Sequence, residues 1–325
     1  MTPLVVAAVL VAAVTHAAWN ALAHHIRDQL LAFTLVGGGG ALCGLVLACF
    51  VPLPAPQAWP ALVVSAVLHV VYQLLLMRSF GLGDFGQMYP VARGTAPLVV
   101  TVLAAFFLQE LPDAWQLTGV AVASAGLLGV ALWGIRAKKG PAAGRGAPAG
   151  HAQPPEGRDE PPEGPAPALE SATSGSSSSS AASSRWPALT AAVATGLAIA
   201  SYTVVDGAGV RASGSALGYV AWLMVLQSFA IPAYAVATRR RALLAQLRPL
   251  ALRGLTAGAL SLAAYGLVLW AQTRAPLAPV AALRESSIIA GAAIGALFFK
   301  ERFGTPRVAA SALMVGGIAL MLHGG

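Results

Sequence analysis

Ten long apolar stretches run through the chain, and each is close to the length that a helix needs to cross a bilayer. A helix rises about 1.5 Å per residue, so roughly 20 residues span about 30 Å of hydrocarbon. Hydrophobic residues make up 57% of the chain and charged residues only 10%, whereas about a quarter of an ordinary soluble domain is charged. The sequence therefore predicts an all-α polytopic membrane protein with ten transmembrane helices. The predicted spans are 3–23, 30–51, 58–77, 87–108, 114–135, 186–205, 216–238, 254–271, 276–299 and 305–322.

The ninth stretch repeats a pair of charges found in the fourth, an arginine near its start and a glutamate at its end. Residues 93–110 read RGTAPLVVTVLAAFFLQE and residues 284–301 read RESSIIAGAAIGALFFKE, so both charges recur at an offset of 191 residues. Because charge is rare inside membrane spans, this recurrence indicates the duplication of a five-helix unit. Two copies of a unit with an odd number of helices lie in opposite orientations, so we expect two inverted five-helix repeats.

A change of composition separates the two halves of the chain. Residues 137–185 are rich in Gly, Pro and Ser and offer few apolar side chains for burial, which is typical of a disordered linker. We therefore expect a first five-helix repeat over residues 1–136, this linker over residues 137–185, and a second repeat over residues 186–325.

The net charge of +8 is distributed unevenly, which favours a membrane orientation over nucleic-acid binding. Sixteen of the 20 Lys and Arg residues fall on the side of the predicted membrane that holds the linker, and only Arg211 and Arg274 fall on the other side. By the positive-inside rule, the linker then faces the cytoplasm of a multi-pass plasma-membrane protein and both termini face outward.

Three kinds of short segment resemble the drug/metabolite transporter superfamily, in particular its ten-helix EamA-type members. These segments are His16–Asn20 (HAAWN), Pro90–Gly94 (PVARG), and the span ends FFLQEL at 106–111 and FFKERF at 298–303. The sixth span departs from the family pattern, because it has Val205 and Asp206 instead of Trp and Asn. The resemblance implies an inverted-repeat carrier with a central cavity, commonly an exporter of small metabolites. Many such relatives are thought to have cytoplasmic termini, so the opposite orientation also stays open.

Two arginines inside predicted spans are the leading candidates for substrate contact. An arginine at a helix centre costs about 2.5 to 3.5 kcal/mol on insertion scales, so Arg93 and Arg284 are expected to face a cavity or a partner. Nearby prolines are expected to kink or break the same two helices, where carriers commonly bind substrate. These prolines are Pro90, Pro97, Pro276 and Pro279.

Two interpretations of the arginines stay open. In the first, one or both guanidinium groups hold an anionic group of the substrate, such as a carboxylate. In the second, an arginine forms a structural bridge to Glu285 or Asp206 across a helix interface. The sequence favours substrate contact for Arg93 and leaves both interpretations equal for Arg284, whose neighbour Glu285 cannot face the same way.

The paired glutamates are predicted to act as a structural hinge or gate. Glu110 and Glu301 end their helices at the C-terminal side, where the helix dipole disfavours a carboxylate. The next helix begins about four residues later in each repeat, so each carboxylate can accept hydrogen bonds from its free N–H groups. Proton coupling is the alternative role for these residues.

Other polar and aromatic side chains are candidates to line the pathway. His16 and Asn20 share one face of the first span, and Tyr202 and Asp206 share one face of the sixth. Protons are a candidate coupling ion, and His16, His69 or Asp206 could carry them, although a lone intramembrane histidine more often packs through a hydrogen bond. The aromatic candidates are Trp19, Tyr72, Tyr89, Tyr202 and Tyr265.

The sequence favours a secondary carrier that moves a small metabolite, such as an amino acid or another carboxylate, by alternating access in the export direction. The alternatives are an intramembrane enzyme that acts on a lipid-linked substrate, and a membrane receptor or scaffold. The chain lacks the Gly-x-Ser-x-Gly and His-Glu-x-x-His motifs and the Gly-Lys-Ser/Thr ending of a nucleotide loop. We therefore predict no enzymatic activity, no catalytic residue, no cofactor and no metal site.

Overall fold

The computed structural model describes residues 1–82 apart from 25 and 27, residues 85–137, 186–291 and 293, and residues 305–323. Within these ranges the chain forms α-helices and short 3-10 helices, with no strand. The first repeat contains α1 (Pro3–His24), α2 (Gln29–Ala48), α3 (Trp59–Leu82), α4 (Phe85–Leu108) and α5 (Ala114–Ala137). The second contains α6 (Trp186–Ala212), α7 (Ala216–Gln227), α8 (Ala230–Leu247), α9 (Ala251–Gln272), α10 (Leu277–Arg284) and α12 (Thr305–His323).

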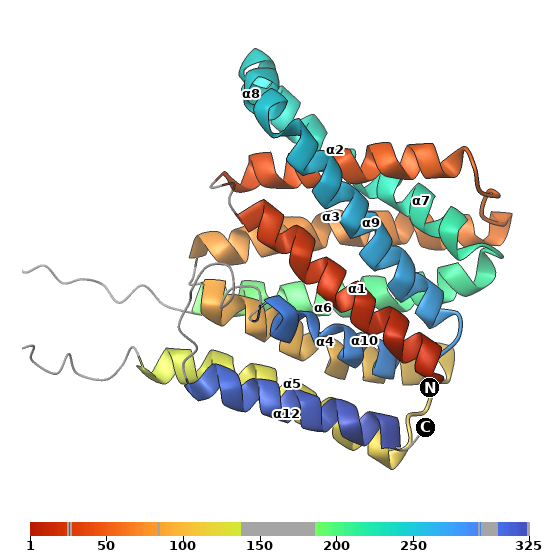
Figure 1. Cartoon of the computed structure of the whole chain (residues 1–325), viewed down its shortest axis with the longest axis vertical. Coiled ribbons are helices and arrows are strands. Elements are labelled where there is room, and N and C mark those ends of the chain that lie inside the picture. Colours follow the sequence, from red (N-terminus) through yellow and green to blue (C-terminus); the bar gives the residue numbers. More distant parts are fainter. Residues whose placement is uncertain are drawn as a thin grey trace, which may run out of the picture.

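The two halves run in opposite directions through the molecule. In Figure 1, α1 begins and α12 ends on one side, whereas α5 ends and α6 begins on the opposite side. The helix contacts keep the same pattern when the repeats are exchanged, because α1 packs on α9 as α6 packs on α3. In addition, α2 packs on α7, α4 on α10 and α5 on α12, so each of these helices contacts its own counterpart. The predicted fold is confirmed: the chain is an all-α polytopic membrane protein of two inverted five-helix repeats.

The predicted spans agree with the helices, with two differences. Within the described parts of the chain, seven helical segments are long and apolar enough to cross a membrane, and two shorter apolar helices cover 114–129 and 308–323. The predicted seventh span is interrupted at Ser228 and Phe229, between α7 and α8, and α8 continues through a non-helical residue at Arg240. The second part of the ninth span and nearly all of the predicted linker lie outside the described residues.

Glycines allow the central helices to approach closely. A Cβ atom on Gly39 of α2 would lie 2.3 Å from the carbonyl oxygen of Gly254 on α9. A Cβ atom on Gly258, one turn further along α9, would lie 2.3 Å from the backbone nitrogen of Gly40. Only residues without a side chain fit at such a crossing, which is the usual device for packing helices within a bilayer.

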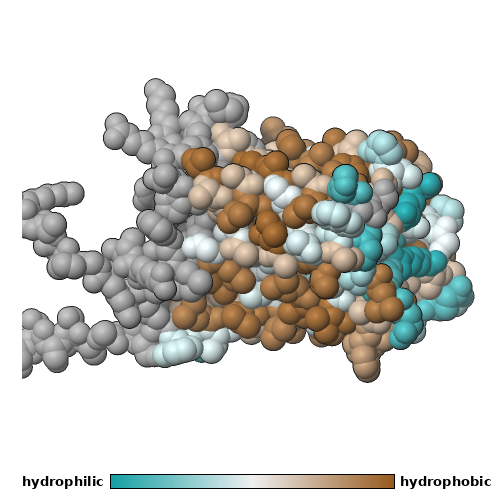
Figure 2. Space-filling view, turned by 90° about the horizontal axis from the view of Figure 1, so that it is seen from below, coloured by the Kyte–Doolittle hydropathy of each residue, from teal (hydrophilic) through white to brown (hydrophobic). Residues whose placement is uncertain are grey.

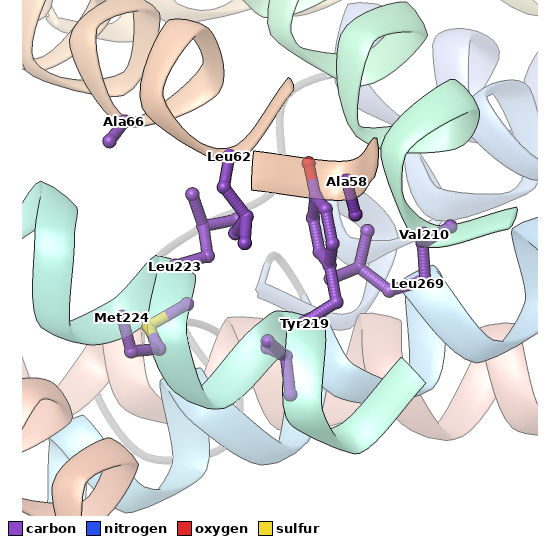
Figure 3. Packing of buried hydrophobic residues seen from close by; sticks show 9 residues of the cluster. Ala58, Leu62, Ala66, Val210, Tyr219, Leu223, Met224 and Leu269 are labelled. Carbon is purple, nitrogen blue, oxygen red and sulfur yellow. The ribbon is translucent and has the colours of Figure 1, made fainter. Parts of the chain in front are cut away.

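A buried apolar cluster joins helices from both repeats around Tyr219. Figure 3 shows the Tyr219 ring extending from α7 toward Leu62 of α3 and toward Ala58, which ends the short 3-10 helix before α3. Leu269 of α9 and Val210 of α6 complete the packing on the same ring. These contacts hold the ends of α3, α6, α7 and α9 together.

The outer surface has the apolar belt that a bilayer requires. Figure 2 shows a broad hydrophobic band over one face of the molecule, with hydrophilic residues gathered at the right of the view. Large apolar side chains such as Val102, Phe106 and Phe107 of α4 are exposed. The buried polar and charged side chains lie in the interior, where the candidate site is found.

Candidate functional site

The broken helix of the second repeat positions the central charges. α10 ends at Arg284, a turn follows at Glu285 and Ser286, and helix resumes at Ser287. Pro276 is the N-cap of α10 and Pro279 lies in its first turn, where a proline removes no helical hydrogen bond. The prolines therefore begin this helix instead of breaking it, which corrects the sequence prediction.

The matching helix of the first repeat is not broken. α4 is continuous from Phe85 to Leu108 although Pro90 and Pro97 lie inside it. The hydroxyl of Thr101 donates to the carbonyl oxygen of Pro97 at 2.8 Å. Packing against neighbouring helices allows a proline within a membrane helix.

Arg93 is buried in an ion pair across the repeat interface. Its Nε lies 2.7 Å from Oε2 of Glu285, and the two side chains are 4% and 1% exposed. Its Nη2 donates to the hydroxyl oxygen of Ser287 at 2.9 Å. The structural bridge that the sequence left as one alternative is therefore present for Arg93, and a contact of Arg93 with substrate stays a prediction.

Arg284 is equally buried but lacks such a partner. Its relative exposure is 5%, and among the described residues its guanidinium group forms no hydrogen bond or ion pair. The group lies within electrostatic range of Tyr202, Tyr265 and the carboxylate of Glu285, and Arg93 adds a second positive charge nearby. His16 of α1 lies within electrostatic range of both arginines.

A second polar cluster surrounds the carboxylate of Asp206, which is completely buried. The hydroxyl of Tyr219 donates to Oδ1 at 2.9 Å, and the hydroxyl of Tyr265 donates to Oδ2. His69 of α3 interacts electrostatically with Asp206, and its Nδ1 lies 3.1 Å from the hydroxyl oxygen of Ser65. Four helices, α3, α6, α7 and α9, thus contribute to one buried polar group.

Aromatic candidates from both repeats contact one another next to Asp206. The rings of His69 and Tyr202 are stacked with centroids 3.9 Å apart, and Tyr72 meets Tyr202 edge-on at 5.6 Å. Tyr265 contacts both His69 and Tyr202, with centroids at 5.5 and 6.4 Å. The structure therefore brings these four predicted residues together. The side chain of Tyr89 lies outside the described residues.

The polar residues of the first span make different contacts from those of the sixth. The Asn20 amide donates to the backbone carbonyl of His16 at 2.8 Å, and the His16 and Trp19 rings meet edge-on at 5.1 Å. The Nε1 of Trp19 is buried without a hydrogen-bond partner among the described residues. Asn20 and Asp206 thus lie at similar places in the first and sixth spans, but they form different hydrogen bonds.

Glu110 joins the two repeats at the termini side, and its partners differ from the predicted ones. Its Oε1 lies 2.5 Å from Nη1 of Arg211, at the end of α6, and its Oε2 accepts from the backbone N–H of Leu277 at 2.7 Å. The N–H groups of the following helix are instead capped by Asp113, which accepts from Gln116 at 2.7 Å. Glu301, the counterpart of Glu110, lies outside the described residues.

A second ion pair joins the repeats at the linker side. Arg239 of α8 lies with its Nη1 2.5 Å from Oδ2 of Asp28, whose Oδ1 caps α2 by accepting from Leu31. The hydrogen bond from Arg239 lowers the pKa of Asp28 below its ordinary value. The pairs of Glu110 with Arg211 and of Asp28 with Arg239 are partly exposed, whereas the pair of Arg93 with Glu285, which also joins the repeats, is buried.

Sequence reasoning missed several partners in these clusters. Ser287 was visible as a polar residue in the ninth span, but its bond to Arg93 was not anticipated. Tyr219 and Ser65 lie singly in apolar runs, which carry no signal for a contact with Asp206. Arg211 was counted only as one of the few basic residues on the termini side.

Comparison with known proteins identifies the family. The model of the EamA-like transporter family matches residues 3–132 and again residues 186–323, one match for each repeat. A solved structure titled "Crystal structure of protein" matches with a TM-score of 0.65 at 15% identity, over 98% of this chain and 99% of that chain, and so has the same fold. A search of the curated proteins finds no match. The chain therefore belongs to the EamA-like transporter family, whose members are membrane transporters of small molecules.

Proposed function

We propose that this protein is a secondary carrier that exports an amino acid or another small carboxylate across the plasma membrane by alternating access. The observation that carries the proposal is the buried guanidinium group of Arg284, which has no hydrogen-bond or ion-pair partner among the described residues. The proposed resting state is closed around this group, since Arg93, Arg284 and Glu285 are each at most 5% exposed.

An unpaired arginine in a membrane interior is costly unless an anion meets it during function. Insertion scales put this cost at about 2.5 to 3.5 kcal/mol. A guanidinium group presents parallel N–H donors that match the two oxygens of a carboxylate, and such charge-assisted bonds are about twice as strong as neutral ones. A carboxylate substrate would therefore supply the charge that Arg284 lacks.

The surroundings of Arg284 support a site for a small organic anion. Arg284 ends α10 beside a helix break, and broken helices at the repeat interface are where carriers commonly bind substrate. The rings of Tyr202 and Tyr265 flank the same region, and they would form an amphipathic wall for the rest of the molecule.

Two ion pairs between the repeats support alternating access. Glu110 with Arg211 joins the repeats at the termini side, and Asp28 with Arg239 joins them at the linker side. Exposed pairs of this kind contribute about 0 to 1 kcal/mol. Either pair can therefore break within a transport cycle while the buried pair of Arg93 with Glu285 keeps the centre together. The excess of basic residues at the linker side supports a cytoplasmic linker.

Flux measurements in proteoliposomes test the proposal. The purified full-length protein would be reconstituted, and counterflow of each of the twenty radiolabelled amino acids and of short mono- and dicarboxylates would be measured. We expect at least one of these solutes to move faster than in protein-free liposomes. Arg284→Gln should reduce its flux at least 10-fold, which corresponds to about 1.4 kcal/mol of lost interaction, and Arg284→Lys should retain part of it.

A matched substitution controls for the loss of a positive charge. Arg274→Gln removes an exposed arginine that lies over the Trp270 ring outside the central cluster, and its flux should equal that of the wild type. If the wild type moves none of these solutes, or if Arg284→Gln moves them at the wild-type rate, the proposal is wrong.

A further inference from the structure

We infer that Asp206 binds the proton that drives transport, and that Tyr219 and Tyr265 position its carboxyl group for this role. This inference rests on the proposed function, because a coupling site requires a solute that moves. Asp206 lies six residues before the end of α6, which places it about 9 Å inside the membrane-spanning helix.

The carboxyl group of Asp206 is enclosed by neutral donors. Tyr219 from α7 and Tyr265 from α9 each donate to one of its oxygens, and the hydroxyl of Ser65 from α3 faces the same group. Both oxygens are therefore held by phenols whose O–H groups can either donate or accept. Such a setting stabilises the carboxylate and also tolerates the protonated acid after a rotation of one hydroxyl.

Among the described residues, no cation forms an ion pair with Asp206. Its titratable neighbours are His69 from α3, Tyr219 from α7 and Tyr265 from α9, while Tyr202 lies one turn away on its own helix. Arg284 from α10 lies within electrostatic range of Tyr202 and Tyr265. A lone ionised carboxylate within the bilayer is expensive, and such groups commonly form proton relays. Protonation of Asp206 would remove this cost.

His69 gives the proton a second acceptor. Its Nδ1 is held by Ser65, with the backbone carbonyl oxygen at 2.9 Å and the hydroxyl oxygen at 3.1 Å. Its ring stacks on Tyr202 and meets Tyr265 edge-on. The imidazole is thus fixed within electrostatic range of the carboxyl group of Asp206.

Tyr265 links the proposed proton site at Asp206 to the proposed substrate site at Arg284. A protonated carboxyl group donates through one oxygen, so one of the two tyrosine hydroxyls has to turn from donor to acceptor. Tyr265 is the tyrosine whose ring also contacts Tyr202 and which lies within electrostatic range of Arg284. Proton binding would therefore change the surroundings of Arg284, which is the requirement for coupling.

Infrared spectroscopy tests the proton site without any substrate. A film of the full-length protein in liposomes would be titrated from alkaline to acidic pH, with the carbonyl stretch of protonated carboxyl groups as the signal. We expect a buried carboxyl band that is missing in Asp206→Asn. Asp113→Asn, which alters an exposed helix cap, should keep the band. Persistence of the complete band in Asp206→Asn would overturn the inference.

Flux measurements test the coupling. With the radiolabelled amino acids and carboxylates described above, and a pH-sensitive dye inside the liposomes, we expect a pH gradient to drive accumulation by the wild type. Asp206→Asn should lose gradient-driven accumulation at least 10-fold but retain counterflow. Asp206→Glu, which keeps a titratable group, should accumulate solute with a shifted pH dependence and guards against a folding defect in the first variant.

The outcomes separate this inference from the proposed function. Gradient-driven accumulation by Asp206→Asn at the wild-type level would contradict proton binding at Asp206 while leaving the carrier intact. Absence of all solute movement in the wild type would contradict the proposed function, and the infrared band would then decide on the proton site by itself.

Discussion

Arg93 and Arg284 occupy matching positions in the two repeats, but their surroundings differ. Arg93 is neutralised by Glu285 and receives a second contact from Ser287. Arg284 has neither contact among the described residues, although it is buried to a similar degree. The two repeats thus match in their backbone and in their arginines, but only Arg93 has a carboxylate partner in a described ion pair.

The sequence positions that follow each arginine explain this difference. At the offset of 191 residues, Glu285 corresponds to Gly94 and Ser287 corresponds to Ala96. Neither Gly94 nor Ala96 has a side chain that can accept a hydrogen bond from Arg284. The second repeat therefore supplies the partner for the arginine of the first, whereas the first repeat supplies none in return. Under the proposed function, the arginine without such a partner is the one that meets the substrate.

Removal of Glu285 should have the largest effect on stability. Glu285→Ala leaves Arg93 as an uncompensated buried charge, which typically costs about 3 to 5 kcal/mol. Unfolding in mixed detergent micelles, followed by tryptophan fluorescence, measures this loss. The double variant Arg93→Met/Glu285→Ala should recover most of it, because it removes both charges. A double variant no more stable than Glu285→Ala would show that the ion pair is not the cause.

Replacement of Arg284 should act in the opposite direction. Arg284→Met removes a buried charge that has no described partner, so we expect equal or higher stability in the same unfolding measurement, by up to about 3 kcal/mol. Arg93→Met, the matched variant in the first repeat, should lower stability because Glu285 is left unpaired. Equal destabilisation by both variants would mean that Arg284 has a structural partner after all.

Loss of the Ser287 hydroxyl should produce a smaller effect. Ser287→Ala removes one hydrogen bond to the charged guanidinium group of Arg93, and such bonds contribute about 1.5 to 3 kcal/mol. We expect a loss near the lower value, because the ion pair with Glu285 remains. Ser286→Ala is the control, since the hydroxyl of Ser286 is buried without a hydrogen-bond partner among the described residues. A loss of stability in Ser286→Ala as large as that in Ser287→Ala would contradict this assignment.

The helices and the duplication were predictable because long apolar runs and rare intramembrane charges are local signals in a membrane protein. Pro276 and Pro279 were expected to kink or break their helix, but Pro276 is the N-cap of α10 and Pro279 lies in its first turn, so the break after Arg284 was not located from the sequence. The partners of Glu110 were missed because they lie 101 and 167 residues away in sequence. A residue's own helix can be read from nearby sequence, whereas the side chain that meets it across the repeat interface depends on how the two halves pack.

The ion pair between Glu110 and Arg211 tests whether burial, as well as pairing, determines how much stability is lost when one partner of an ion pair is removed. The two side chains are 18% and 32% exposed, so water and salt screen their attraction. Arg211 also donates to the carbonyl oxygens of Gln272 and Ala275, at 2.8 and 3.1 Å. Arg211→Gln should therefore cost only about 1 kcal/mol or less, and the difference from the wild type should shrink as salt is added. A loss as large as that of Glu285→Ala, unchanged by salt, would mean that the termini side is held shut as rigidly as the centre, and the alternating opening proposed for this carrier would then need a different gate.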